Sequence, residues 1–419
     1  MPDSLTRGPN IAVLVTLDSK DAAARFICEV LRGLGAEPWL VDPSLRPHDI
    51  AGAILGGGEL AELSGTSWNA MAGMERSEAA ETMIIGATRA LLDKYEAGGI
   101  DGVIGIGGAN GSTVFCAMMR ALPPLFPKVM VTPVAATAAV QWYVAESDIA
   151  MFPTIGDIVL NRVTRAVMEN AAHAVVGMAE AHRARAGRDD DSPPLVGVSS
   201  FGNLQKCVDR VTDRLEAEGF EVMHFHASGP GGKALENLAG RGLLAGVIDI
   251  TTSELTDLLT GGVYSAGDGR LKSAGAAGLP QVVAPGAIDH TNWWVGECPE
   301  RYRDREFYQY NVEILLMRTN AEEMTTLGEL FAERLNAAAG PVTVMIPTQG
   351  FSQHVIRKTQ DIDGNVVGEW KQPETDRRFT EAVRAKLSHG AVKELDLHIN
   401  DDAFADACVD EFLSMMARQ

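Results

Sequence analysis

The chain carries the same pattern twice, and this repetition limits the fold more than any other feature of the sequence. Residues 11–42 contain a short apolar run, a polar loop, an amphipathic stretch and a second apolar run, and residues 195–226 repeat that order at a constant offset. The matching positions and segments are Leu31/Leu215, Gly35/Gly219, Glu37/Glu221, 102–106/246–250 and 131–135/283–287. Internal repetition of one supersecondary unit predicts two similar structural units.

Strand-like runs alternate with amphipathic helical patterns in both halves of the chain. This alternation predicts an α/β fold with two similar Rossmann-like parallel-sheet domains, residues 1–188 and 189–419, and a ligand cleft between them. We expect a loop over residues 56–73 and one long helix over 155–185, followed by a linker at 186–194. The expected strands are 11–16, 37–41, 102–106, 129–132, 195–199, 221–225, 246–250, 281–284, 342–346 and 393–398. A last helix, 401–417, packs across one of the two domains, and crossing back to the first domain is one alternative.

Composition excludes several classes of function. The net charge of −20 argues against a nucleic-acid partner, which needs a basic surface, although backbone amides still bind small anions. The five cysteines are scattered without a C-x-x-C pair, which favours reduced thiols in a cytoplasmic protein. We see neither an apolar leader nor an apolar run of the roughly 18 residues that a membrane span needs. A homo-oligomer is expected only because symmetric dimers are common among soluble proteins.

A glycine-rich loop follows the expected strand 102–106 and precedes a helix. Backbone N–H groups and the helix dipole converge on an anion at such a place, and neighbouring hydroxyls bind phosphate or a metal. The alternative is a tight turn that is merely rich in glycine. The loop is neither a Walker A motif nor a complete G-x-G-x-x-G, because Asn110 takes the last glycine position. Its candidate ligand-binding residues are Gly107, Gly108, Asn110, Gly111, Ser112 and Thr113.

The loop after the first strand offers Thr16, Asp18 and Ser19. Asp18 or Ser19 could cap the first helix, and the functional alternative adds contact with the same ligand, because first βα loops point toward the ligand crevice.

In the second half, residues 229–233 form a generic anion loop. Ala227 and Ala234 stand where a Walker A motif needs glycine and a hydroxyl residue. Glu254 follows a strand, where it is a helix-start residue stabilised by the dipole, a general base or an Mg²⁺ ligand. Asp289 and His290 also follow a strand, where they would face the cleft and His290 could exchange protons near neutral pH. The alternative for His290 is a solvated loop histidine.

His224 and His226 share one face of an expected strand, a spacing that permits a metal site, but the sequence shows no third ligand. The metal ligands therefore stay unassigned.

These residues together resemble the Tm-1-like ATP-binding proteins, also called UPF0261, a family with a plant member that inhibits tobamovirus RNA replication. The most specific match is GVIDITTSELTD at residues 246–257, followed by Gly261 and Gly262. The chain departs from the family pattern at Asn110, at residues 132–138 and at His354. The matching segments are 11–20, 107–113, 225–236, 246–257, 261–263, 283–289, 316–319 and 398–401.

The resemblance implies two Rossmann-like domains that bind ATP with Mg²⁺, without a settled reaction. Our first hypothesis is a small-molecule enzyme whose nucleotide lies on the 107–113 loop, with Glu254 or Asp289 as base or metal ligand. The alternatives are a non-catalytic, nucleotide-dependent regulatory protein that binds a partner, and an ATP-independent enzyme for an anionic metabolite such as a sugar acid. The candidate substrate-binding residues are Gly231, Gly232, Lys233, Thr252, Ser253, Gly286 and Arg318.

Overall fold

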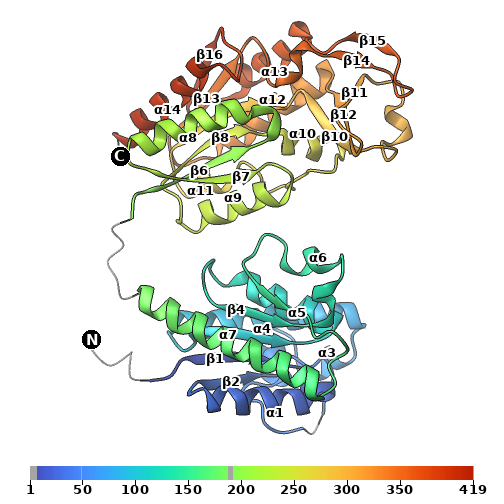
Figure 1. Ribbon diagram of the computed structural model, residues 1–419, viewed down its shortest axis with the longest axis vertical. Helices are drawn as coiled ribbons and strands as arrows, with labels where there is room; N and C mark the ends of the chain where they lie inside the picture. The colour runs from blue at the N-terminus through green and yellow to red at the C-terminus, as the bar shows by residue number, and fades with distance from the viewer. Residues whose placement is uncertain (1–6, 49, 187–191, 419) are drawn as a thin grey trace. The chain divides into compact units, whose positions relative to one another are not determined.

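A computed structural model describes residues 7–48, 50–186 and 192–418 (Figure 1). These residues divide into two compact units, one on each side of residues 187–191. The expected domain boundary at residues 188 and 189 and most of the expected linker lie outside the described residues. Each unit is an α/β structure around a parallel sheet, so the predicted fold class is confirmed.

The first unit contains a five-stranded parallel sheet with the order β2-β1-β3-β4-β5. The chain moves outward from β1 in one direction to β2 and in the other direction to β3. The strand order therefore reverses between β1 and β3. The strands are β1 Asn10–Leu14, β2 Glu37–Val41, β3 Gly102–Ile106, β4 Lys128–Val131 and β5 Ala150–Phe152.

Helices cover both faces of this sheet. On one face α1 and α7 bury Ile27 and Met168 against the strands, and on the other face α4 and α5 bury Met83 and Phe115. The helical segments are α1 Leu17–Gly33, α2 Gly57–Leu63, α3 Trp68–Ala72, α4 Arg76–Glu96, α5 Ala109–Ala121, η1 Pro133–Ala136, α6 Val140–Val144 and α7 Arg162–Ala186.

Two expectations for this unit were wrong, and local capping explains both. Residues 56–73 are not one loop, since α2 and α3 lie within them. The Glu59 carboxylate accepts the Gly56 N–H at 2.7 Å, and the Ser67 hydroxyl accepts the Ala70 N–H at 3.2 Å. The long helix begins at Arg162 rather than at 155, because the Asn161 side chain accepts the N–H of Val163 at 2.8 Å and caps it there.

The repeated glycines end equivalent helices in the two units. Gly35 after α1 and Gly219 after α8 have φ of 80° and 85°, the left-handed region that glycine adopts without steric cost. The residue after each glycine donates its N–H to Leu31 O at 2.9 Å and to Leu215 O at 3.1 Å. The sequence repeat is therefore a repeat of helix-terminating geometry as well as of apolar pattern.

The second unit contains a six-stranded parallel sheet with the order β16-β13-β9-β8-β6-β7. Its inner order β7-β6-β8-β9 reproduces β2-β1-β3-β4 of the first unit, and the order again reverses, here between β6 and β8. The strands are β6 Leu195–Ser200, β7 Glu221–His226, β8 Gly246–Thr251, β9 Gln281–Gly286, β13 Val342–Pro347 and β16 Ala391–Leu395.

The C-terminal helix α14 packs within the second unit, where Phe412 and Cys408 are buried against α8 and the sheet. Asp406 of α14 accepts hydrogen bonds from Arg210 and Arg214 of α8 at 2.7 and 2.9 Å. The helical segments of this unit are η2 Gly202–Leu204, α8 Gln205–Ala217, α9 Pro230–Gly240, α10 Ser253–Thr260, α11 Ser273–Ala276, η3 Glu300–Tyr302, α12 Ala321–Asn336, η4 Gln353–Ile356, α13 Pro373–Lys386 and α14 Asp402–Met416.

The sequence analysis missed a second sheet in this unit. It is antiparallel, with the order β10-β12-β11-β14-β15, and it is formed by the segments that follow β9 and β13. Its strands are β10 His290–Trp294, β11 Phe307–Gln309, β12 Ile314–Arg318, β14 Lys358–Gln360 and β15 Val366–Glu369.

We expect Phe412→Ala to lower the free energy of unfolding of the second unit by about 3–5 kcal/mol, because the buried ring leaves a cavity. The Phe412 ring packs edge-on against Phe220 at 6.0 Å and lies against Gly246. Urea denaturation followed by circular dichroism measures the effect. Phe412→Leu, which keeps most of the volume, is the control and should cost clearly less; a loss below about 1 kcal/mol for alanine would contradict this packing.

Candidate functional site

The first unit has a cavity of ≈ 790 Å³ at the carboxyl ends of β1, β2 and β3. This volume lies within the roughly 300–1,000 Å³ range of small-molecule sites. The loops after β1 and β3 leave the sheet in opposite directions because the strand order reverses between these strands, and they open a crevice there. The cavity therefore lies where an open parallel sheet is expected to bind its ligand.

The glycine-rich loop forms one wall of this cavity. Gly107 must be glycine, because a Cβ there would lie 2.8 Å from Gly111 Cα and 3.0 Å from the Phe115 ring, whereas a Cβ on Gly108 would meet no atom within 4 Å. Gly108 is the residue before α5, so the first N–H groups of that helix have no partner inside the helix. Of the residues predicted in this loop, the lining includes Gly107, Gly108, Asn110, Gly111 and Thr113.

Ser112 is the one residue of the predicted set that does not reach the cavity. Its side chain is buried, and its hydroxyl lies 2.8 Å from the Thr132 hydroxyl on the other side of α5. Thr113 lines the cavity, but its hydroxyl donates to Ala109 O at 3.1 Å. The backbone of this loop is therefore better placed for a ligand than its hydroxyl groups.

The loop after β1 forms the opposite wall with Thr16, Asp18, Ser19 and Lys20. Thr16 precedes α1 and makes no side-chain cap hydrogen bond; its hydroxyl lies 3.1 Å from that of Ser19. The buried Asp42 carboxylate, at the end of β2, accepts the Leu17 N–H at 2.9 Å and fixes the course of the loop. The predicted capping by Asp18 or Ser19 is therefore not seen, and these side chains face the cavity.

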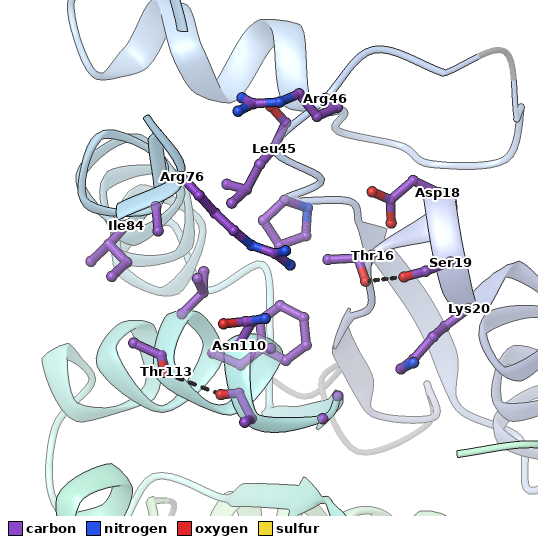
Figure 2. A pocket seen from close by; sticks show the side chains of 18 of the residues that line it. Thr16, Asp18, Ser19, Lys20, Leu45, Arg46, Arg76, Ile84, Asn110 and Thr113 are labelled. Atoms are coloured by element: carbon purple, nitrogen blue, oxygen red, sulfur yellow. Dashed lines mark hydrogen bonds between the residues drawn. The ribbon is translucent and has the colours of Figure 1, made fainter. Parts of the chain in front are cut away.

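Sequence reasoning missed the arginines of this site. Figure 2 shows Arg76, the first residue of α4, extending into the middle of the pocket toward Thr16 and Asn110. The side chains of Arg76 and Lys20 have no hydrogen-bond or ion-pair partner among the residues that the structure describes. Arg46 also lines the cavity, but its guanidinium donates to backbone carbonyls, including Met74 O at 3.0 Å. The sequence did contain a signal for Arg46. Loops at the carboxyl ends of parallel strands face the ligand crevice, and this rule applies to the loop after β2 as well as to the loop after β1.

The remaining lining combines apolar and acidic groups. Leu45, Ile84 and Phe115 contribute apolar surface, and Asp18 and Glu81 contribute carboxylates. An anion that carries an apolar or planar group fits this combination, with a divalent cation between its charge and a carboxylate.

In the second unit the predicted anion loop is occupied by the protein itself. The Glu254 carboxylate accepts the N–H groups of Gly229 at 2.7 Å and Gly232 at 3.1 Å, at the start of α9. A Cβ on Gly232 would lie 2.0 Å from Glu254 Oε2, so this glycine is needed for the contact. Gly231 is in the same helical turn, and Lys233 beside it is exposed.

Glu254 belongs to a buried ion network. Arg270 Nε donates to Glu254 Oε2 at 2.7 Å, and its Nη2 donates to Asp249 Oδ1 at 2.7 Å. Burial alone would lower the pKa of Arg270, but the two carboxylates raise that pKa well above its ordinary value, so the guanidinium stays charged. Both carboxylate oxygens of Glu254 thus accept hydrogen bonds from the protein, which is the arrangement of a structural group. The predicted catalytic role of Glu254 stays a prediction.

Thr252, Ser253 and Gly286 also lie at the carboxyl edge of the parallel sheet of this unit, whereas Arg318 ends β12 of the antiparallel sheet. The Thr252 hydroxyl donates to Ala284 O at 3.0 Å. Position 286 requires glycine, because a Cβ there would lie only 2.0 Å from Ile250 O. Ser253 is buried. Arg318 is 2% exposed and bonds to Asp376 and to backbone carbonyls, so no part of its guanidinium faces a ligand.

Asp289 is buried and accepts three hydrogen bonds. They come from His290 Nδ1 at 3.0 Å, Ser352 Oγ at 2.6 Å and Trp370 Nε1 at 2.7 Å. The expectation that the two sets of residues face each other across one cleft stays a prediction, because each unit is described by itself.

The two histidines on β7 do not form a metal site in the described part of the chain. His224 Nε2 lies 2.7 Å from the Thr212 hydroxyl, and among the described residues no three His, Cys, Asp or Glu side chains gather as metal ligands. No helix in the described ranges is long and apolar enough to cross a membrane.

Comparison with known families matches both halves of the chain. Residues 9–184 match the N-terminal domain, and residues 193–416 the C-terminal domain, of an uncharacterised protein family, UPF0261. A UPF0261 protein of Mesorhizobium japonicum is 37% identical over 95% of this chain and 97% of its own. A UPF0261 protein of Clostridium tetani is 33% identical over 97% of this chain and 99% of its own.

The ToMV resistance protein Tm-1(GCR237) of Solanum lycopersicum is 34% identical over 75% of this chain, which corresponds to 41% of the tomato protein. Among solved structures, UDP-N-acetylglucosamine 2-epimerase from Rickettsia bellii covers 98% of both chains at 10% identity, with a TM-score of 0.25. A likeness this distant carries no argument about function.

We expect Gly107→Ala to lower the free energy of unfolding of the first unit by about 1–3 kcal/mol, because its Cβ would overlap Gly111 and the Phe115 ring. Gly108→Ser is the matched control, since its Cβ would enter open space and serine is favoured at the residue before a helix, so it should change stability by less than about 0.5 kcal/mol. Chemical denaturation of the two variants side by side tests the loop geometry. Equal losses would show that the loop packs differently.

Proposed function

The chain belongs to the uncharacterised protein family UPF0261, and we propose that its first unit binds ATP together with Mg²⁺ in the cavity at the carboxyl ends of β1, β2 and β3. The observation that carries this proposal is Arg76. Its guanidinium has no partner among the described residues and extends into a cavity that the N-terminus of α5 also faces. A cation and a helix start that face the same space favour a multiply charged anion.

The phosphates would lie on the loop that leads into α5. The free N–H groups after Gly108 donate to phosphate oxygens, and the open space over Gly108 admits them closely. Arg76 supplies charge from one side, and Lys20 from the other (Figure 2). These groups come from three different elements, as expected of a site at a strand-order reversal.

The nucleoside would use the apolar part of the cavity. Leu45 from the β2 loop, Ile84 from α4 and Phe115 from α5 contribute this surface. The cavity of ≈ 790 Å³ has room for a base and ribose beside the phosphates.

The residues present also fit Mg²⁺. Magnesium in nucleotide sites is held by phosphate oxygens, water and one or two carboxylates. Asp18 lines the cavity, and its carboxylate has no hydrogen-bond partner among the described residues; the Thr16 and Ser19 hydroxyls are beside it. When bound, Mg²⁺ would neutralise phosphate charge, while Asp18 and these hydroxyls hold it against the β1 loop.

The same features would suit a smaller anionic metabolite, such as a sugar acid, and this is the second candidate. The apolar wall favours the nucleotide, because a small acid would leave this surface without contact. Whether bound ATP is consumed or only sensed is a separate question, and the likeness to a tomato resistance protein makes a regulatory, non-catalytic role the alternative to an enzyme.

We expect Arg76→Ala to raise the Kd for Mg-ATP by about 10- to 100-fold, since one hydrogen bond to a charged group contributes about 1.5–3 kcal/mol. Arg89→Ala is the matched control, because Arg89 is an exposed arginine of the same helix that does not line the cavity. Isothermal titration calorimetry with ATP, with and without Mg²⁺, measures both. Equal affinities in the two variants would place the nucleotide elsewhere.

We expect Gly108→Asp to weaken Mg-ATP binding by at least about 10-fold, because a carboxylate at the start of α5 repels phosphate. Gly108→Asn has nearly the same shape without the charge, and it should retain more affinity than aspartate. Both residues are good helix caps, so the fold is preserved. A thermal-shift series with ATP, ADP, GTP, NAD and sugar acids reads the outcome. No shift with millimolar nucleotide, alongside a shift with a sugar acid, would replace ATP by the second candidate.

A further inference from the structure

A second cluster of polar groups lies in the other unit, and none of its residues lines the cavity of the first unit. It lies where β6, β9 and β13 end, and it contains Asn203, Asp289, His290 and His354. His290 and His354 are 0% and 2% exposed, yet His290 Nε2 and His354 Nδ1 have no hydrogen-bond partner among the described residues. Buried polar atoms are normally paired, so unpartnered atoms on two adjacent histidines indicate groups that serve a ligand.

Asp289 determines which nitrogen of His290 carries the proton. Burial raises the pKa of Asp289, but the hydrogen bond from His290 and the charge of Arg318 outweigh it, so the pKa lies below its usual range. The ionised carboxylate only accepts hydrogen bonds, and His290 Nδ1 lies 3.0 Å from Asp289 Oδ1. His290 therefore donates from Nδ1, and in the neutral imidazole Nε2 is the nitrogen that carries the lone pair. Ser352 and Trp370 hold the other carboxylate oxygen and fix this geometry.

His354 presents the opposite group. Its Nε2 lies 3.3 Å from Asn203 Nδ2, which donates only, so Nε2 accepts and Nδ1 carries the proton. Burial, together with the nearby His290, lowers the pKa of His354 to about 3, so this imidazole is neutral near neutral pH. The ring centroids of the two histidines are 5.5 Å apart. The cluster thus pairs a base with a neutral N–H donor.

The surroundings of this pair come from the antiparallel sheet. Tyr308 and Tyr310 lie 5.4 and 5.8 Å from His354 between ring centroids, and Trp370 lies 6.0 Å from His290. Tyr310 is 45% exposed, which places this side of the cluster next to solvent. The guanidinium of Arg357, 5.6 Å from the Tyr308 ring, adds a positive charge at the same side.

We propose that this cluster is a second ligand site, which binds a small 2-oxo acid and transfers a proton between its carbon 3 and His290 Nε2. The C–H bond breaks, its electron pair forms the enolate, and the proton forms the N–H bond on His290. His354 Nδ1 donates a hydrogen bond to the carbonyl oxygen as negative charge develops there, a role that suits a neutral imidazole. Asp289 is a positioning residue that stabilises the imidazolium. Return of the proton completes the step without any further reactant.

Other chemistry is less well served by these residues. Ser352 donates its hydroxyl to Asp289 rather than to a histidine, so it is not activated as a nucleophile. The nearby Arg318 is fully engaged with Asp376 and backbone carbonyls, which leaves Arg357 to attract the carboxylate of the acid. A carbonyl compound with one carboxylate therefore matches the base, the donor and the exposed cation together.

The test is solvent exchange in D₂O with the full chain and three probes: pyruvate, 2-oxobutyrate and 2-oxoglutarate. Proton NMR follows the loss of the carbon 3 signal. We expect the protein to accelerate exchange of at least one probe, and His290→Gln to remove about 10²–10⁴-fold of the acceleration. His224→Gln is the matched control, because His224 is on β7 and contacts Thr212 instead. Rates equal to the protein-free blank for all three probes, or unchanged in His290→Gln, would overturn the proposal.

A second measurement does not depend on how the variant folds. Nitrogen-15 NMR of histidine-labelled, unmodified protein should show His290 protonated at Nδ1 and His354 protonated at Nδ1, with both unprotonated nitrogens at Nε2. Addition of an exchanging probe should shift His290 Nε2 and His354 Nδ1. A His290 protonated at Nε2, or signals that do not respond to any probe, would contradict the site. No nucleotide is present in either measurement, so failure of the Mg-ATP proposal leaves both results unaffected.

Discussion

Parallel pairing of the strands in the two large sheets is the constraint from which the other features follow. Parallel strands place all their carboxyl ends at one edge, so the residues that follow β1, β2 and β3 meet there although they are far apart in sequence. The reversal of strand order between β1 and β3 then separates two loops and leaves a space that side chains do not fill. Arg76 from α4 lines this space as well. The position of the cavity therefore follows from the strand topology, and a few side chains such as Arg76 determine its chemistry.

In the second unit, which has the same strand topology, a side chain of the protein occupies the equivalent loop. Its glycine loop at the start of α9 has the geometry of an anion site, but the Glu254 carboxylate occupies it, and Arg270 neutralises that carboxylate in turn. The contrast with the first unit is local: a Cβ on Gly108 would meet open space, whereas one on Gly232 would collide with Glu254. The two repeats therefore share a topology, but only the loop before α5 leaves room for an external anion.

The sequence predicted the parts of the fold that depend on local pattern. Alternating apolar runs and the helix-ending Gly35 and Gly219 are readable one segment at a time, and the two parallel sheets follow from them. The antiparallel sheet was missed because strands as short as β11 and β14 carry too few residues for a period to appear. Arg76 was missed for another reason: its distance from the glycine loop depends on how α4 packs. Ser112, which was predicted to bind the ligand, does not line the cavity, because one helical step decides which face a side chain takes.

The second unit also separates two kinds of buried polar group. Arg270, Asp249 and Glu254 satisfy one another, and such a network holds one arrangement of the strand ends in place. His290 and His354 leave one nitrogen each without a partner, at a cost of about 1–3 kcal/mol for each such atom. The chain accepts this cost beside a carboxylate, Asp289, that is itself fully hydrogen-bonded. Other buried polar atoms of this unit, such as Ser253 Oγ and Trp293 Nε1, also have no partner among the described residues, so it is the combination of two adjacent unpartnered imidazole nitrogens with a carboxylate that distinguishes this cluster as a site for a ligand.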